Sequence, residues 1–273
     1  MTSTPTSTTG VATVRGAELA YTRTGTGPVV IVAHGLTSSR ASNAATGLLD
    51  MSPLTEVGFT VIAYDARGHG ESTGTPDPDD YLWPSLADDL LAFAEIVAPG
   101  QQVAVVGNSM GTATAIYAAL KEPERIGALV LTAPPTAWQT RTEQSARYVR
   151  MAEAIEADDQ QTLQELFADA VEPEIFADMI SEPPVPDIRP ELMPVIIRGA
   201  AATDLPATDK IAQLTCETLL LPWASDPGHP VSTAVTLAET MINSRLRIAH
   251  NAEQVKAYGR WASRFLQEVF GGG

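Results

Sequence analysis

Short apolar runs alternate with amphipathic segments along most of the chain. The apolar runs predict strands at 11–14, 19–23, 29–33, 60–64, 103–106, 128–132, 218–221 and 246–249. The middle runs are continuously apolar, as expected of parallel strands that helices cover on both faces. Helical stripes lie between the runs, one formed by Leu86, Leu90, Phe93 and Val97. The pattern predicts an α/β fold with an eight-stranded, mostly parallel sheet.

The alternation of strands and helices stops between residues 134 and 209. Helical segments at 138–155, 160–171 and 174–180 precede a stretch that holds Pro183, Pro184, Pro186, Pro190 and Pro194. An insertion at this point rises from the strand ends, so we expect 134–209 to form a helical cap, or lid, over the site. The core then comprises 11–133 and 210–270. Residues 1–10, rich in Thr and Ser, are expected to be a disordered tail.

Composition narrows the class of partner. The 273 residues carry 17 Lys+Arg against 33 Asp+Glu, a net charge of −16 that repels nucleic acid and anionic membranes. The single cysteine, Cys216, excludes an intrachain disulfide and is expected to be a buried small hydrophobe. No stretch approaches the roughly 18 apolar residues of a membrane span. We expect a soluble cytoplasmic protein with a small-molecule substrate, and the sequence leaves its oligomeric state open.

The strongest motif is Gly107-Asn108-Ser109-Met110-Gly111, a G-x-S-x-G between the apolar run 103–106 and the helical segment 112–120. A serine at a sharp strand-to-helix turn takes up strained backbone angles, and small flanking residues let strand and helix approach. Ser109 is therefore predicted to be a nucleophile. The alternative, a glycine-flanked serine in an ordinary turn, does not require both flanks to have the right periodicity.

From 11 to 269 the chain resembles the α/β-hydrolases. That resemblance implies the order Ser, Asp/Glu, His for the catalytic residues and two backbone N–H donors for the oxyanion. His34-Gly35-Leu36 resembles the family's H-G-x oxyanion loop, so the expected donors are the N–H groups of Leu36 and Met110. The segment 64–72, Y-D-A-R-G-H-G-E-S, resembles the family's D-x-R-G-x-G-x-S loop. We expect this loop to be scaffold, with His69 structural.

The segment 221–230 resembles the family's acid loop and makes Asp226 the expected acid. Asp226 could instead cap the helix that begins near 231, and Asp204 is a weaker candidate. The base is open between two histidines. His250 has the family's chain order but abuts its strand, which lies about 14 Å from the fifth strand at about 4.8 Å per strand. His229 lies one strand spacing nearer, and on balance we expect His250.

These residues predict a serine hydrolase that cleaves a carboxylic ester or lactone of a small, mostly apolar substrate through an acyl-enzyme. Hydrolysis of C–C bonds in ring-cleavage products, thioester hydrolysis, cofactor-free perhydrolysis and a receptor-like protein without turnover are the alternatives. Family members with an aspartate nucleophile, the epoxide hydrolases and haloalkane dehalogenases, are disfavoured by Ser109. No cofactor or metal is expected. The expected pocket residues are His34, Trp138, Tyr148 and Met151.

Overall fold

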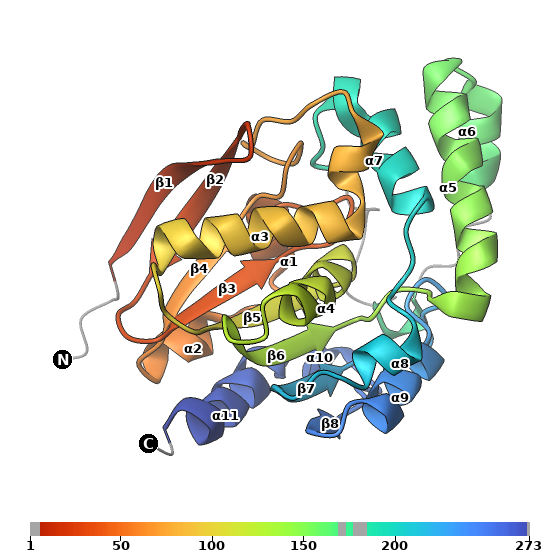
Figure 1. Ribbon diagram of the computed structural model, residues 1–273. Helices are drawn as coiled ribbons and strands as arrows, with labels where there is room; N and C mark the ends of the chain where they lie inside the picture. Colours follow the sequence, from red (N-terminus) through yellow and green to blue (C-terminus); the bar gives the residue numbers. More distant parts are fainter. Residues whose placement is uncertain (1–5, 169–172, 177–184, 272–273) are drawn as a thin grey trace.

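The computed structural model describes residues 6–168, 173–176 and 185–271. Within them an eight-stranded sheet has the order β1-β2-β4-β3-β5-β6-β7-β8 (Figure 1). Strand β2 is antiparallel to both of its neighbours, β1 and β4, and all other neighbouring pairs are parallel. This mostly parallel sheet confirms the predicted α/β architecture. The strands are β1 Ser7–Val14, β2 Ala17–Thr24, β3 Val29–Ala33, β4 Thr60–Tyr64, β5 Val103–Asn108, β6 Ile126–Thr132, β7 Glu217–Leu221 and β8 Ser244–Leu246.

Two predicted boundaries differ from the structure. Residues 7–10, expected in a disordered tail, begin β1 and pair with residues 21–24, while residues 1–5 lie outside the described part. The pairing follows from a two-residue hairpin at Arg15 and Gly16, both with positive φ, which fixes the register of the whole ladder. The last strand covers only Ser244–Leu246 instead of 246–249.

Helices cover both faces of the sheet, as the apolar strands require. Consecutive residues of β3 face opposite ways, since Ile31 packs with α3 and α4 whereas Val30 packs with α11. The core helices, including the short 3-10 turn η1, are η1 Pro78–Tyr81, α1 Arg40–Thr46, α2 Ser52–Glu56, α3 Trp83–Val97, α4 Met110–Lys121, α8 Thr208–Ile211, α9 Val231–Thr240, α10 Ala252–Lys256 and α11 Tyr258–Phe270. No helix in the described ranges is both long and apolar enough to cross a membrane.

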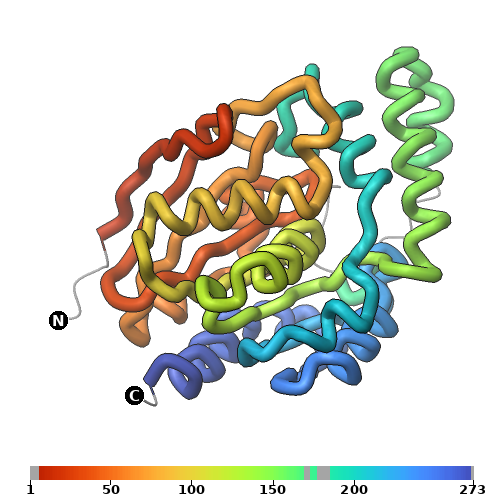
Figure 2. Tube along the Cα trace, in the orientation of Figure 1, coloured from red at the N-terminus to blue at the C-terminus, as the bar shows by residue number. Residues whose placement is uncertain are grey.

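The insertion between β6 and β7 extends beyond the carboxyl ends of the strands, where α5 and α6 stand away from the sheet (Figures 1 and 2). Its elements are η2 Trp138–Thr140, α5 Arg141–Glu156, α6 Gln160–Ala168, η3 Glu174–Phe176, η4 Pro190–Leu192 and α7 Met193–Ala201. The predicted helical residues 169–171 and 177–180, and Pro183 and Pro184, lie outside the described ranges.

Arg141 anchors the insertion to the core. Its guanidinium is buried, stacks 4.3 Å from the Trp83 ring centroid and donates from Nε to Thr203 O at 2.8 Å. A second nitrogen donates to Ala200 O near the end of α7. Because the last carbonyls of a helix carry partial negative charge, the Ala200 carbonyl stabilises this cation.

Candidate active site

Ser109 occupies the turn between β5 and α4, with φ 51° and ψ −111°. These angles are strained for a residue with a side chain, and they raise the hydroxyl above the tip of the strand. The flanking glycines are required by space. A Cβ on Gly107 would lie 2.4 Å from Gly111 O, and one on Gly111 would lie 2.1 Å from Ala33 O. The turn that the motif predicts is therefore the one that the chain forms.

A chain of hydrogen bonds leads from Ser109 to a buried carboxylate. The Oγ of Ser109 lies 2.8 Å from Nε2 of His229, whose Nδ1 lies 2.7 Å from Oδ2 of Asp226. Asp226 Oδ2 also accepts from Trp223 Nε1 at 2.7 Å, and Oδ1 accepts from the Gly228 N–H at 2.9 Å. With the carboxylate ionised, Nδ1 of His229 carries the proton, and Nε2 is free to accept one from Ser109.

The electrostatics of Asp226 favour its ionised form. Burial acts to raise the pKa of this carboxyl, but the hydrogen bonds and charge of His229 and the Trp223 and Gly228 donors together hold the pKa below its usual value. Asp226 is therefore an anion at neutral pH. An anion beside the imidazole stabilises the imidazolium that forms whenever His229 takes a proton.

The preference for His250 as the base is not supported by the geometry. His250 is exposed at the end of the β8 segment, and its backbone N–H donates to Gln254 Oε1 at 2.7 Å. Helix α10 begins at Ala252, which leaves no loop that could curl inward to Ser109. Ser225, with φ 60°, turns the chain after β7 instead, and this turn carries His229 to Ser109. The sequence signal was present in the three-residue spacing of Asp226 and His229.

The expected oxyanion donors are the backbone N–H groups of Leu36 and Met110. Met110 is the first residue of α4, so its N–H has no partner within the helix. The loop 34–36 passes directly beside the serine, since a Cβ on Gly35 would lie 3.4 Å from the Ser109 Cβ. Neither the Leu36 N–H nor the Met110 N–H donates a hydrogen bond within the described ranges. Both donors are therefore available to an oxyanion that forms at Ser109.

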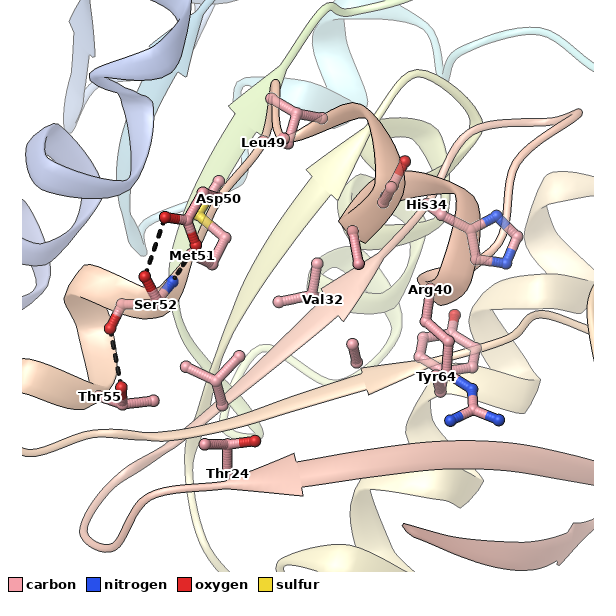
Figure 3. Close-up of a pocket in the computed structure, with 15 residues that line it drawn as sticks. Thr24, Val32, His34, Arg40, Leu49, Asp50, Met51, Ser52, Thr55 and Tyr64 are labelled. Carbon is pink, nitrogen blue, oxygen red and sulfur yellow. Dashed lines mark hydrogen bonds between the residues drawn. The ribbon is translucent and has the colours of Figure 1, made fainter. Parts of the chain in front are cut away.

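The four expected pocket residues are dispersed. His34 is buried, accepts from the Ala66 N–H through Nε2 at 2.9 Å, and lines a cavity of about 660 Å³ under α1 and α2 whose lining does not include Ser109 (Figure 3). Trp138 is held by Asp204 and donates from Nε1 to Pro206 O at 3.0 Å. The Tyr148 ring lies 5.5 Å from the Arg141 guanidinium carbon, and Met151 is half-buried on α5.

The groove beside Asp226 is lined by both polar and apolar surface. A groove of about 910 Å³ runs between α5 and the loop after β7, and its lining includes Arg147, Arg150 and Asp226. The sequence analysis expected apolar side chains on this helix and did not single out these two arginines. No group of three or more His, Cys, Asp or Glu side chains in the described ranges is arranged to hold a metal ion.

Comparisons with known proteins give a consistent family. A family model described as alpha/beta hydrolase fold matches residues 28–176. An epoxide hydrolase of Caballeronia sordidicola is 30% identical over 163 residues, 60% of this chain and 46% of that protein. Bifunctional epoxide hydrolase 2 of Sus scrofa is 31% identical over 114 residues, 42% of this chain and 20% of that protein. The chain thus matches less than half the length of these curated relatives.

Likeness to solved structures covers nearly the whole chain. A thermophilic esterase from Thermogutta terrifontis has a TM-score of 0.75 and 22% identity, and the match covers 96% of this chain and 99% of that one. At this level of identity the likeness shows the fold alone.

Proposed function

The chain belongs to the α/β-hydrolase family, and from this premise we propose that it is a serine hydrolase that cleaves a carboxylic ester or lactone of a small, mostly apolar substrate through an acyl-enzyme. The observation that carries the proposal is the hydrogen-bonded series Ser109, His229 and Asp226. A serine, a base and a buried acid in this order have the parts that acyl transfer needs.

Each step uses a group of the site. His229 Nε2 accepts the proton of Ser109 as Oγ attacks the substrate carbonyl, and Asp226 stabilises the resulting imidazolium. The oxyanion is bound by the N–H groups of Leu36 and Met110, and the positive N-terminal end of the 12-residue helix α4 adds to their effect. His229 then protonates the leaving group. It next takes a proton from the water that attacks the acyl-enzyme, and returns it to Ser109 Oγ as the acyl–oxygen bond breaks.

Two observations weigh on the alternatives. The epoxide hydrolase names among the relatives raise that chemistry, but opening an epoxide through a covalent ester requires a carboxylate nucleophile, and this chain has Ser109 at the turn. Hydrolysis of a C–C bond, thioester hydrolysis and perhydrolysis use the same nucleophile and stay secondary. A receptor-like protein without turnover is disfavoured by the 2.8 Å contact between His229 and Ser109.

The insertion, by its position, is proposed to be the cap that selects the substrate.

The test is hydrolysis of 4-nitrophenyl butyrate combined with fluorophosphonate labelling. We expect turnover with a burst of nitrophenol, and a label at Ser109 that Ser109→Ala abolishes. His229→Ala should lower kcat at least about 10³-fold, whereas His250→Ala, the matched control on an exposed histidine, should stay within about threefold of the wild type. Absence of both turnover and label would overturn the proposal. A larger loss in His250→Ala would return the role of base to His250.

A further inference from the structure

His69 is a buried histidine that the proposed reaction does not use. It lies in the loop after β4, fully enclosed, with Nε2 2.5 Å from Leu36 O and Nδ1 2.8 Å from Arg67 O. Both partners are carbonyl oxygens and can only accept. Burial lowers the pKa of His69, against the opposing effects of the Arg67, Leu36 and Ala66 backbone groups and of Asp65. Of the two contacts, the one to Leu36 is shorter.

The carbonyl that His69 contacts belongs to Leu36, whose N–H is a proposed oxyanion donor. Three successive carbonyls of this loop are held in place. Gly35 O lies 2.8 Å from His34 Nδ1, Leu36 O lies 2.5 Å from His69 Nε2, and Thr37 O accepts from the Asp187 N–H at 2.9 Å. The Leu36 N–H shares a peptide plane with the Gly35 carbonyl, and the Leu36 carbonyl belongs to the next plane. Contacts that hold both carbonyls therefore limit the rotation of the Leu36 N–H.

His69 is itself rigidly supported from three directions. Its backbone N–H donates to Ala66 O at 3.0 Å, and the residue forms an isolated bridge with Ile188 of the insertion. The ring centroid lies 5.0 Å from that of His34. Because tightly packed side chains have little room to move, a side chain fixed in this way also restrains the position of the residue it contacts.

We propose that His69 is a positioning residue of the oxyanion hole: its Nε2–H donates to the Leu36 carbonyl and thereby keeps the Leu36 N–H turned toward the substrate carbonyl oxygen. This proposal rests on the serine hydrolase function proposed above. It differs from a purely structural role for the ring. A structural role affects the amount of folded protein, whereas a positioning role affects the stabilisation of the oxyanion in protein that is fully folded.

Two substitutions separate the contacts of the two ring nitrogens. In His69→Gln the amide nitrogen extends to the place of Nε2 and keeps the donor to Leu36 O. In His69→Asn the shorter amide reaches only the place of Nδ1, near Arg67 O. The first variant therefore retains the proposed contact and the second loses it. Both replace an aromatic ring by an amide, so each is the matched control of the other.

The experiment measures kcat and KM for 4-nitrophenyl butyrate and the affinity of an aryl trifluoromethyl ketone, which forms an oxyanion with the serine. We expect His69→Asn to lower kcat 10- to 100-fold with KM within about threefold, and to weaken ketone binding by a similar factor. His69→Gln should stay within about threefold of the wild type in all three quantities. Thermal melts establish that each variant is folded.

Equal losses of activity in folded His69→Gln and His69→Asn would overturn the proposal, as would unchanged kcat in His69→Asn. If His69→Asn does not fold, His69→Met, which fills the same space without a donor, takes its place with the same expected losses. Failure of the proposed function itself is recognised separately, because the wild type would then show neither turnover nor label at Ser109.

Discussion

Protonation of His34 is incompatible with the hydrogen bonds that hold it in the fold. Its side chain is buried, with Nε2 accepting from the Ala66 N–H and Nδ1 lying 2.8 Å from Gly35 O. A proton on Nε2 would turn this acceptor into a donor that faces another donor. Burial and, to a smaller extent, the neighbouring His69 lower the pKa of His34 from 6.5 to about 3.

This difference in pKa makes folding depend on pH with a definite sign. The unfolded chain binds a proton at His34 below pH 6.5, and the folded chain does not until about pH 3. The contribution is therefore complete above pH 6.5 and is lost as the pH falls toward 3. The slope is about 1.4 kcal/mol per pH unit for one group, which gives a loss of about 2 kcal/mol between pH 7 and pH 5.

Urea unfolding at pH 7 and pH 5 measures the effect as a difference between proteins. The wild type should lose about 2 kcal/mol more free energy of unfolding over this interval than His34→Asn, because all other titrating groups are common to both. His34→Asn should itself be less stable at pH 7 by about 1–3 kcal/mol, the cost of leaving the buried Ala66 N–H without its acceptor. The exposed His250→Asn is the control. Parallel pH dependence of wild type and His34→Asn would refute the reasoning.

The elements that local sterics determine were predictable from the sequence. The turn at Ser109 follows from an apolar strand, two glycines that must approach other backbone atoms, and a helix with one apolar face. The expected oxyanion donors, the Leu36 and Met110 N–H groups, stay predictions: the structure shows the loop 34–36 beside Ser109 and Met110 at the start of α4. The strand, turn and helix around Ser109 depend on neighbours within a few residues, where spacing along the chain is a good guide to spacing in the fold. The approach of Gly111 to Ala33 O is instead a contact between residues distant in sequence.

The contact between His229 and Ser109 could not be predicted because it depends on the path of a turn. Ideal strand spacing gave the distance of His250 from the fifth strand but carried no information on the direction of the chain after β7. In the structure the turn at Ser225 brings His229 to Ser109, while α10 starts too soon after His250 for that residue to move inward. A histidine three residues after the acid was the available clue.

The expected apolar pocket illustrates a second limit. Trp138 and Tyr148 lie on the insertion as predicted, but their partners are Asp204, Pro206 and Arg141, which are distant in sequence. The sequence pattern of an amphipathic helix is the same whether an aromatic side chain packs in a core or lines a pocket. Only the tertiary packing decides between these roles.

Two further predictions concern the serine turn and the acid. Gly111→Ala should destabilise the fold by about 3 kcal/mol or more in urea unfolding, because the new Cβ would meet Ala33 O at 2.1 Å; an unchanged midpoint would show that the helix can shift away. Asp226→Asn should lower kcat about 10⁴-fold with little change in KM, since the amide favours the wrong tautomer of His229. Asp204→Asn, which alters the acceptor of the Trp138 and Leu205 N–H groups, should leave kcat within about threefold, and a reversed order would transfer the role of acid to Asp204.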